Sequence, residues 1–588
     1  MIGAMRTPTR KTRLLVLFLL LSFLLTPAAS ARVNRQSPPP EAQSSPEAAL
    51  QGALIAKVYF ANTDDLNRLA GDLDVWEVDH AHGYLVAMVT SEQITGLQAA
   101  GYRVEVDARR TAAIGLRNVP LPGQTSGIPN FPCYRTVEET YASLARLAAD
   151  HPKLAAWIDI GDSWEKVTPG GEPGYDLHAL VLTNQSVPGP KPDFVLMAAI
   201  HAREYATAEL AARFAEHLVE QYGVNPDVTW LLDHFKVHIL PQANPDGRKI
   251  AETGDLWRKN TNPQGCKLLP GSWGTDLNRN SSFKWGGVGA STFGCDQTYR
   301  GKSAASEPET QAVQSYLAAI FPDRRGPADS DPAPLDSSGV FITLHSYWPL
   351  VLFPWGWQPG PAPNNAQLET LGRKFGFFNQ YPVCQSGEPG CIYATSGTSD
   401  DWAYGDLGVA AYTFEVGTEF FQSCSVFENE ILPDNLPALL YALKAARRPY
   451  QAPAGPDTLQ VSVSAGQVQA GTPVLLTARA DDTRYDSNGW GQEPVQAIVA
   501  ARYSLEAPSW KGSAQTHPLD PADGDFDASQ EGLSANLDTT GWAPGRHLIY
   551  VESRDSAGNW GVPSAVFLTI TLEPPVFLPV IHYAPPAD

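Results

Sequence analysis

Hydrophobic runs and amphipathic segments alternate along the middle of the chain, from about 135 to 448. Phe194–Ile200, for example, is an apolar run of strand length, and Leu210, Phe214 and Leu218 follow it on one helical face. This alternation predicts an α/β fold in which helices flank a mixed, mostly parallel sheet. The expected strands are 155–160, 178–182, 194–200, 236–240, 341–346 and 411–415.

The last part of the chain has a different pattern. Beyond about residue 458, short alternating strands are separated by turn residues such as Pro544-Gly545. That pattern predicts an immunoglobulin-like β-sandwich. A run of oxygen-bearing side chains could bind calcium, although the pattern favours a solvated acidic loop; it consists of Asp481, Asp482, Asp486 and Asn488.

A smaller pattern precedes the α/β part. Between Leu54 and Val106, strand and helix segments follow one another in the order β-α-β-β-α-β, which is typical of a ferredoxin-like α+β domain. It ends at Arg109-Arg110, a dibasic pair in an expected exposed link, where proteolysis concentrates. We interpret residues 32–110 as a pro-segment that blocks a site until it is cleaved. A stable accessory domain is the alternative.

The N-terminus has the layout of a signal peptide. Basic residues precede an apolar run from Leu14 to Leu25, and small residues follow near Ala31. The run is short for a membrane span, and a retained anchor is the alternative. We expect secretion into an oxidising compartment, where the six cysteines can form disulfides.

These patterns divide the chain into seven parts. They are a signal peptide (1–31), the pro-segment (32–110), a linker (111–132), the α/β domain (133–450), a linker (451–457), the β-sandwich (458–575) and a C-terminal tail (576–588). The net charge of −21 argues against nucleic-acid binding, which needs a basic face. We expect a monomer that binds neither nucleic acid nor, after removal of the signal peptide, a membrane.

Three of the predicted strands end in titratable residues. The first leads into His201 and Glu204, the second ends at His345, and the third ends at Glu415. Sites form where the carboxyl ends of neighbouring strands meet. Two imidazoles and a carboxylate are the ligands of a catalytic zinc, and a further glutamate can act as a base. Taken alone, His-x-x-Glu favours a helix-capping carboxylate beside a chance histidine.

Candidate substrate anchors lie between these strands. Asn278 and Arg279 fall in a glycine-rich region, and the planar guanidinium of Arg279 suits a carboxylate. Arg258 offers a second guanidinium. Surface ion pairs are the alternative interpretation of both arginines.

Seven short segments together resemble one known family. They are 201–204 (His-Ala-Arg-Glu), 257–260 (Trp-Arg-Lys-Asn), 276–280 (Asp-Leu-Asn-Arg-Asn), 298–302 (Thr-Tyr-Arg-Gly-Lys), 344–347 (Leu-His-Ser-Tyr), 393–402 and 414–416 (Phe-Glu-Val). In order and spacing, the chain from Cys133 to Arg448 is similar to the zinc metallocarboxypeptidases of the A/B (M14) type, in their bacterial secreted branch. The resemblance implies an eight-stranded carboxypeptidase fold.

The resemblance also implies a role for each matched residue. One Zn²⁺ would be bound by His201, Glu204 and His345, with Asp276 orienting His201. Glu415 would act as general base and then acid, and Arg258 would stabilise the oxyanion. Asn278 and Arg279 would hold the carboxylate of a peptide or protein C-terminus. The remaining matched positions would contact substrate further out: Tyr393, Arg203 and Tyr347.

The cysteines and one departure complete the resemblance. Cys266 and Cys295 match the disulfide-bearing region of the family. Cys384 and Cys391 flank a short Gly/Pro loop and are candidates for a second bridge; the pairing of Cys133 and Cys424 stays open. Asp255 stands where the family has an arginine, which removes one outer substrate contact.

Asp400 bears on specificity. Aligned on Tyr393 and Trp402, it falls at the position that sets side-chain preference in the family. An aspartate there resembles the B type, which accepts Lys and Arg, because a carboxylate in an enclosed pocket favours a cation. The sequence therefore predicts a preference for basic or mixed C-terminal residues.

Two alternatives to a carboxypeptidase remain. The first is a related zinc deacylase or cell-wall peptide hydrolase; Asn278, Arg279 and Tyr393 favour an enzyme that binds a free peptide C-terminus over these. A non-catalytic binding protein on this scaffold would be expected to lose Glu415 or a metal ligand, and the sequence keeps all of them. In either case, the β-sandwich is a candidate for contact with a surface or a carbohydrate.

Overall fold

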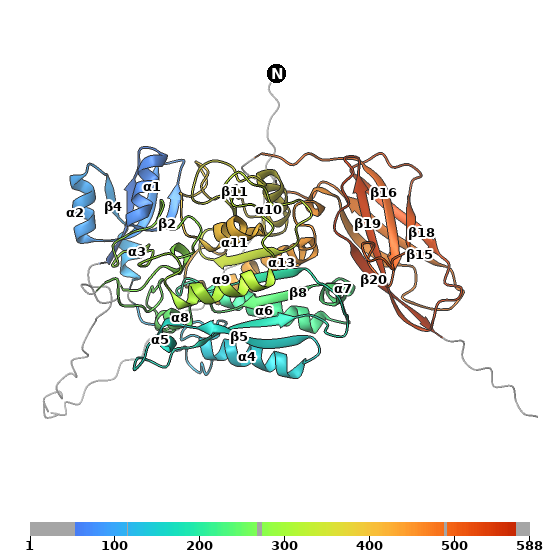
Figure 1. Cartoon of the computed structure of the whole chain (residues 1–588), viewed down its shortest axis with the longest axis horizontal. Helices are drawn as coiled ribbons and strands as arrows, with labels where there is room; N and C mark the ends of the chain where they lie inside the picture. The colour runs from blue at the N-terminus through green and yellow to red at the C-terminus, as the bar shows by residue number, and fades with distance from the viewer. Residues whose placement is uncertain (1–52, 115, 267–272, 487–490, 572–588) are drawn as a thin grey trace, which may run out of the picture. The chain divides into compact units, whose positions relative to one another are not determined.

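The computed structural model describes residues 53–114, 116–266, 273–486 and 491–571 (Figure 1). The expected signal peptide (1–31), the start of the expected pro-segment and the expected tail (576–588) lie outside these residues. Among the residues described, no helix is both long enough and apolar enough to cross a membrane.

The α/β part is built on an eight-stranded mixed sheet (Figure 1). The strand order is β11-β10-β12-β9-β7-β8-β6-β5. Parallel pairing joins β8, β7, β9 and β12 in one row and also joins β10 to β11; the other pairs are antiparallel. The predicted α/β fold is confirmed. The strands are β5 (Ala155–Asp162), β6 (Asp176–Leu182), β7 (Asp193–Met197), β8 (Lys236–Leu240), β9 (Val340–His345), β10 (Leu350–Phe353), β11 (Val383–Gln385) and β12 (Ala410–Glu415).

Burial explains why the central strands are almost wholly apolar. Phe194 on β7, Phe341 on β9 and Phe414 on β12 are all fully buried. Each such side chain contributes about 1.5–3 kcal/mol relative to exposure. Helices pack on the sheet through their apolar faces: α4 contacts β5 and β6, and α10 contacts β10, β11 and β12. The longer helices are α4 (Val137–Asp150), α6 (Tyr205–Gln221), α7 (Pro226–His234), α9 (Pro308–Ile320), α10 (Asn365–Asn379), α11 (Ser399–Leu407) and α13 (Leu432–Ala445).

A four-stranded antiparallel sheet precedes the α/β part. Its order, β2-β3-β1-β4, comes from a β-α-β-β-α-β succession of elements. Arg109 and Arg110 are exposed, as expected from the sequence, and they lie on a short helix, α3, which Asp107 caps. The elements are β1 (Ala53–Tyr59), α1 (Thr63–Asp72), β2 (Asp74–Asp79), β3 (Tyr84–Thr90), α2 (Ser91–Ala99), β4 (Val104–Val106) and α3 (Ala108–Ala112).

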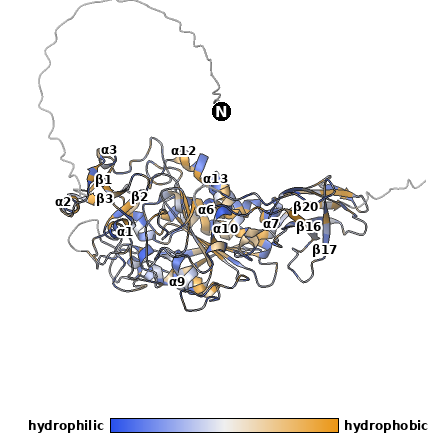
Figure 2. Ribbon diagram, turned by 90° about the horizontal axis from the view of Figure 1, so that it is seen from above, coloured by the Kyte–Doolittle hydropathy of each residue, from blue (hydrophilic) through white to orange (hydrophobic). Residues whose placement is uncertain are grey.

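The C-terminal strands follow the order β13-β15-β18-β17-β16-β19-β20-β14. Strand β17 pairs with both β16 and β18, so the two halves of the sheet are continuous at one side. Residues from both halves bury one shared apolar cluster, and β16 and β20 carry many hydrophobic residues (Figure 2). The strands are β13 (Asp457–Val463), β14 (Gln467–Gln469), β15 (Val474–Asp481), β16 (Ile498–Leu505), β17 (Thr516–Pro521), β18 (Gln530–Leu537), β19 (Gly545–Asp555) and β20 (Ser564–Thr571).

The C-terminal sheet and the α/β part share a hydrophobic core. Leu548 and Tyr550 on β19 belong to the same buried cluster as the central strands. Asp457, at the end of the expected linker 451–457, is buried and forms ion pairs with Lys374 (2.9 Å) and Arg484 (2.8 Å). This stretch is therefore packed between the two parts.

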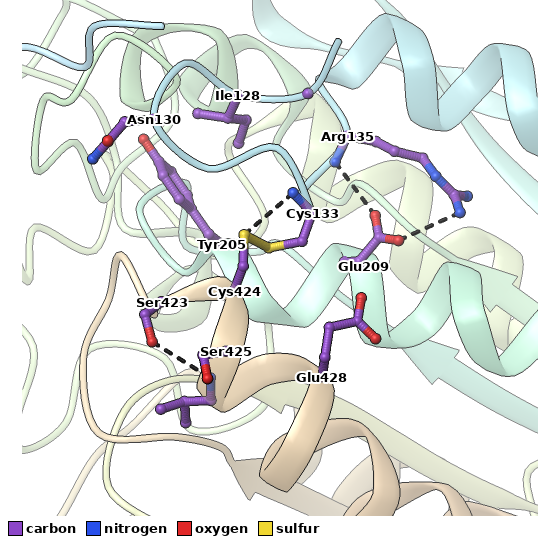
Figure 3. The surroundings of a disulfide bond; sticks show 12 residues. Ile128, Asn130, Cys133, Arg135, Tyr205, Glu209, Ser423, Cys424, Ser425 and Glu428 are labelled. Atoms are coloured by element: carbon purple, nitrogen blue, oxygen red, sulfur yellow. Dashed lines mark hydrogen bonds and ion pairs between the residues drawn. A yellow bond between two sulfur atoms is a disulfide. The ribbon is translucent and has the colours of Figure 1, made fainter. Parts of the chain in front are cut away.

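Three disulfides cross-link the α/β part. Cys266 pairs with Cys295, and Cys384 pairs with Cys391. Cys133 pairs with Cys424 across a sequence separation of 291 (Figure 3). This last bond ties the start of the α/β part to the segment before α13, and cross-links of this kind typically stabilise a fold by about 2–4 kcal/mol.

Candidate metal centre and active site

The site lies at the carboxyl ends of three neighbouring parallel strands. Strands β7, β9 and β12 lie side by side, so their ends meet at one edge of the sheet. His345 ends β9, and Glu415 ends β12 directly opposite it in register. His201 and Glu204 follow β7 in the turn into α6. The strand ends that the sequence picked out are therefore brought together.

A tight turn between β7 and α6 places His201 and Glu204. The strand ends at Met197, three residues earlier than expected, and Ala199 takes a left-handed conformation with φ of 53°. Its N–H donates to the Thr207 hydroxyl (3.1 Å), which in turn donates to the Glu204 carbonyl (2.9 Å). These bonds fix the direction in which the first turn of the helix begins.

A buried arginine that the sequence did not single out stabilises this turn through hydrogen bonds. Arg248 is fully buried and donates to the carbonyls of Ala202 (3.2 Å), Glu204 (3.1 Å) and Tyr205 (3.1 Å). Carbonyl groups of a turn have no helical partner, so a guanidinium that binds three of them stabilises the local shape. No local sequence signal marks this role.

The donor atoms fit a zinc ion. The ligand atoms of His201, Glu204 and His345 lie within 4.8 Å of one another, and all three residues are buried. The two imidazole Nδ1 atoms face each other at 3.1 Å, and Glu204 Oε2 lies 3.4 Å from His345 Nδ1 without a hydrogen bond among the described residues. Ligands of a tetrahedral zinc with bonds of about 2.0–2.1 Å are about 3.3 Å apart. Two imidazole nitrogens and a carboxylate oxygen that face one another at these distances can bind one metal cation.

Asp276 connects the metal centre to Arg258. Its Oδ1 lies 3.2 Å from His201 Nε2, which leaves Nδ1 of that ring for a metal. Its Oδ2 accepts hydrogen bonds from Arg258 Nε (3.1 Å) and Nη2 (2.8 Å). Arg258 Nη1 has no hydrogen-bond partner within the described ranges and lines the cavity. One carboxylate thus orients both an imidazole and a guanidinium.

The protein groups alone shift the titration of these residues strongly. Burial raises the pKa of Glu415 to about 8, which the charge of His345 opposes only in part. Burial also works against ionised Glu204 and ionised Asp276. In both cases neighbouring positive charge outweighs it and holds the pKa low, from His201 and His345 for Glu204 and from Arg258 and His201 for Asp276. Burial lowers the pKa of His201.

The anchor residues lie on one wall of the same cavity. Arg279 donates through Nε to the Gly289 carbonyl (2.6 Å) and through Nη1 to the Asn278 carbonyl (2.9 Å), which fixes its plane. Asn278 Oδ1 accepts hydrogen bonds from Ser399, so its Nδ2 remains as a donor. Both side chains line the cavity together with Tyr393.

Asp400 lies on α11 and lines the cavity too. Its Oδ2 accepts a hydrogen bond from the Thr413 hydroxyl (3.0 Å), and its Oδ1 accepts one from the Asp401 N–H (2.9 Å). Each carboxylate oxygen therefore has one partner. No lysine or arginine forms an ion pair with Asp400 among the described residues.

Strand β2 of the N-terminal sheet covers the cavity. Asp74 forms two hydrogen bonds of 2.7 Å with the fully buried Arg203, and Glu77 accepts one from the Tyr347 hydroxyl (3.0 Å). Trp76 lies edge-on against Phe420. With β2 in place the cavity is about 100 Å³, whereas ligand pockets usually measure about 300–1,000 Å³.

Arg203, Tyr347 and Tyr393 therefore face the N-terminal domain in this form of the chain. Arg203 and Tyr347 bind its acidic side chains, and Tyr393 packs against its apolar cluster. The sequence singled out these three side chains as substrate contacts. It gave no signal for Asp74 or Glu77, their partners across the interface.

The remaining candidates fall elsewhere. Asp255 lies apart from the residues that line the cavity, and burial raises the pKa of its carboxyl. Asp481 accepts hydrogen bonds from Thr483 and Gln530, and Asn488 lies outside the described residues. Within the described ranges, the group formed by His201, Glu204 and His345 is the one cluster with metal-ligand geometry, so the structure gives the calcium interpretation no support.

Comparison with known proteins agrees with this geometry. A family model described as zinc carboxypeptidase matches residues 140–436. Carboxypeptidase A2 of Rattus norvegicus is 30% identical over 315 residues, covering 52% of this chain and 67% of the relative. Zinc carboxypeptidase A 1 of Anopheles gambiae is 28% identical over 396 residues, covering 66% and 81%. Both relatives are from animals, and they give no support to the expected bacterial branch.

Solved structures agree on the fold. Carboxypeptidase A from Helicoverpa armigera has a TM-score of 0.53 at 21% identity, covering 68% of this chain and 98% of that one. Thrombin activatable fibrinolysis inhibitor has a TM-score of 0.51, also at 21% identity, covering 67% and 99%. At this identity the likeness concerns the fold alone.

Proposed function

The chain belongs to the zinc carboxypeptidase family and is a metallocarboxypeptidase, and on that basis we propose that it is a secreted exopeptidase that releases basic or mixed C-terminal residues. The observation that carries the specificity is the buried carboxylate of Asp400, which lies in the same cavity as Arg279 and Asn278 and has no cationic partner among the described residues. A peptide whose last carboxylate meets Arg279 can direct its last side chain toward Asp400.

The carboxylate anchor consists of two fixed donors. Arg279 binds carbonyl groups through Nε and Nη1, and within the described ranges its Nη2 and the amide N–H₂ of Asn278 have no acceptor. A carboxylate accepts hydrogen bonds from both, and charge-assisted bonds of this kind are stronger than neutral ones. An internal peptide bond carries no such charge, so the anchor favours a free C-terminus.

The chemistry follows from the groups that surround the scissile bond. His201, Glu204 and His345 would hold the zinc, which when bound polarises a carbonyl and makes water more acidic. Glu415 takes the proton of the attacking water on a carboxylate oxygen and then gives it to the leaving amine. Arg258, fixed by Asp276, donates a hydrogen bond to the oxygen on which negative charge develops.

The hypothesis that residues 32–110 are a pro-segment rests on the cavity that strand β2 covers. Asp74 and Glu77 occupy the two side chains, Arg203 and Tyr347, that a longer peptide would contact. A space of about 100 Å³ is small for a terminal residue with its carboxylate. Cleavage near Arg110 would detach the N-terminal domain and open the site. Activity that is equal before and after this cleavage would exclude the idea.

Secretion is supported by the apolar N-terminal run and by three disulfides in the described part of the chain. The mature N-terminus of protein recovered from the culture medium tests it directly. A product that keeps residues 1–31 and stays with the membrane fraction would contradict it.

The decisive experiment combines metal analysis with a substrate panel. The cleaved enzyme should contain one zinc per chain and should hydrolyse blocked dipeptides ending in Lys or Arg faster than those ending in Phe or Leu. Asp400→Asn should lower kcat/KM for Lys and Arg ends by about 10–100-fold, because a charge-assisted hydrogen bond is lost, and should leave Phe and Leu ends nearly unchanged.

Asp406→Asn is the matched control for this variant. It removes the same charge from an exposed position on the same helix, α11. If Asp400→Asn slows all four substrates equally, Asp400 supports the fold and does not select the substrate.

A further inference from the structure

A second, larger cavity lies between the α/β part and the C-terminal sheet. It measures about 600 Å³ and opens to solvent. One wall comes from the residues that follow α13, including Arg447 and Arg448, and the other from the C-terminal strands and loops, including Arg502, Trp510 and Trp560. None of its lining residues lines the catalytic cavity.

The charge of this cavity is opposite to that of the chain. The whole sequence has 63 acidic and 42 basic residues, with a net charge of −21. The lining of the cavity holds Lys444, Arg447, Arg448 and Arg502 but a single acidic residue, Glu552. Lys444 pairs with Asp227, and Arg502 pairs with Glu552 at 2.6 Å. Two guanidinium groups therefore remain uncompensated.

These two guanidinium groups have no carboxylate partner within the described part of the chain. Neither Arg447 nor Arg448 forms an ion pair or a side-chain hydrogen bond there. Arg447 is partly buried and lies over the ring of Trp510 at 4.5 Å. Burial and the nearby charges of Arg448 and Arg502 lower the pKa of Arg447 to about 10. Ordering like charges without a counterion is costly.

Aromatic rings hold the arginines in fixed planes. Arg502 lies over Trp560 at 3.8 Å, as Arg447 does over Trp510. A stacked guanidinium keeps its fork of N–H donors at the ring edge, which is the geometry that binds a planar or tetrahedral oxyanion through two bonds.

We propose that this cavity binds an oxyanion group, a carboxylate, sulfate or phosphate, held between Arg447 and Arg448. The size of the cavity accommodates a disaccharide bearing such a group as well as the free anion. The site is separate from the peptidase centre and does not depend on the specificity proposed for Asp400. Its ligand would bridge the catalytic part and the C-terminal sheet.

The alternative role of the arginines is structural. Basic residues after a helix favourably oppose the negative end of its dipole, and both arginines follow α13. That role predicts a change in stability when either is replaced but no change in ligand binding. The two roles are therefore separable by experiment.

Isothermal titration of the full chain tests the proposal with four probes. They are sodium sulfate, sodium phosphate, a sulfated or uronic-acid disaccharide, and a neutral disaccharide. We expect binding of at least one oxyanionic probe and none of the neutral disaccharide. Binding of the inorganic anions as tight as that of the acidic disaccharide identifies a free anion as the ligand; tighter binding of the disaccharide identifies an acidic saccharide.

Three variants of the site and one control show whether the site is the one described. Arg448→Gln, at an exposed position, and Arg447→Gln should each weaken binding by roughly tenfold or more, since a charge-assisted bond is lost. Arg447→Lys keeps the charge and should weaken it less. Arg324→Gln, which removes the same charge from an exposed pair with Asp336, should leave it unchanged.

Two results would overturn the proposal. One is the absence of heat with every oxyanionic probe at low ionic strength. The other is binding that survives both glutamine variants while the melting temperature of the chain falls, which would assign the arginines to helix and interface stability. Hydrolysis of a short peptide substrate should stay the same in all variants.

Discussion

The two outer parts of the molecule are attached to the α/β part in different ways. The N-terminal domain has its own apolar cluster, against which Trp348 and Tyr393 of the α/β part pack, and polar pairs such as Asp74 with Arg203 also join the two. The C-terminal sheet contributes Leu548 and Tyr550 to the central core and is joined by a buried ion pair. Separating two parts that share one apolar core exposes more apolar surface to water than separating two parts that each have their own core. The N-terminal attachment therefore suits release, and the C-terminal attachment suits permanence.

The largest expected effect comes from removing the catalytic carboxylate, in a chain from which the N-terminal domain has or has not been cleaved. Glu415→Gln should lower kcat by about 10²–10⁴-fold in the cleaved enzyme, because the group that moves the proton is lost. The residual activity of the uncleaved chain should fall by a similar factor, since the same group moves the proton in both forms. Steady-state kinetics on both forms measure this, and comparable activity of the cleaved variant and the cleaved wild type would remove Glu415 from the mechanism.

The second prediction concerns the contact between the C-terminal sheet and the α/β part. Asp457→Asn leaves the ammonium of Lys374 buried without its counterion, and both side chains are almost fully inaccessible. Breaking a buried pair in this way costs about 3–5 kcal/mol. We expect denaturant unfolding to show that loss in a single transition for the α/β part and the C-terminal sheet.

The matched control for that variant is Asp336→Asn. It breaks an exposed pair with Arg324 and should cost less than about 1 kcal/mol. Two separate transitions in the wild type would show that the shared core does not couple the two parts.

The third prediction concerns the contact between the N-terminal domain and the α/β part. Asp74→Asn removes the charge that faces Arg203, and losing one partner of a buried pair between domains costs about 2–5 kcal/mol of association. The residual activity of the uncleaved chain should rise by roughly 30-fold or more, the factor that corresponds to the lower end of that range, while its unfolding midpoint should change little. Asp64→Asn, at an exposed position on α1 of the same domain, should leave the activity as it is. An equal rise in this variant would show that removing any negative charge from the domain weakens its attachment.

The smallest expected effect is a pH dependence within the α/β part itself. Burial raises the pKa of Glu209 to about 7, although Arg135 beside it has the opposite effect (Figure 3). The folded state thus holds this proton more tightly than the unfolded state does. The resulting stability is complete below the unfolded pKa, near 4.5, and is lost as the pH rises toward 7.

Glu209→Gln should therefore flatten the decline in unfolding free energy between pH 4.5 and pH 7. Denaturant titrations at several pH values measure the slope. An unchanged slope in the variant would assign the decline to other groups.

The sequence was sufficient where local pattern and chemistry coincide. An apolar run that ends in His345 or Glu415 carries both its secondary structure and its chemical meaning, and parallel pairing then brings the ends together. Short strands such as β10 and β11 were missed, because four or three residues carry too little periodic signal.

Contacts between distant segments were out of reach of the sequence. Asp74 and Arg203 are separated by 129 positions, and nothing near either residue indicates the other. The same holds for Arg248, which follows β8 in the chain and binds the turn into α6, and for Arg447 in the second cavity. Their meaning depends on what the fold places beside them.

One hydrogen bond has a practical consequence for redesigning selectivity. The hydroxyl of Thr413 donates to Asp400, and Thr413 precedes Glu415 by two positions on β12, so both side chains point to the same face. Replacing Asp400 with an aliphatic residue would leave the buried Thr413 hydroxyl without its hydrogen-bond acceptor, close to Glu415. Compensating mutations at Thr413 should therefore accompany any attempt to retune the enzyme toward uncharged termini.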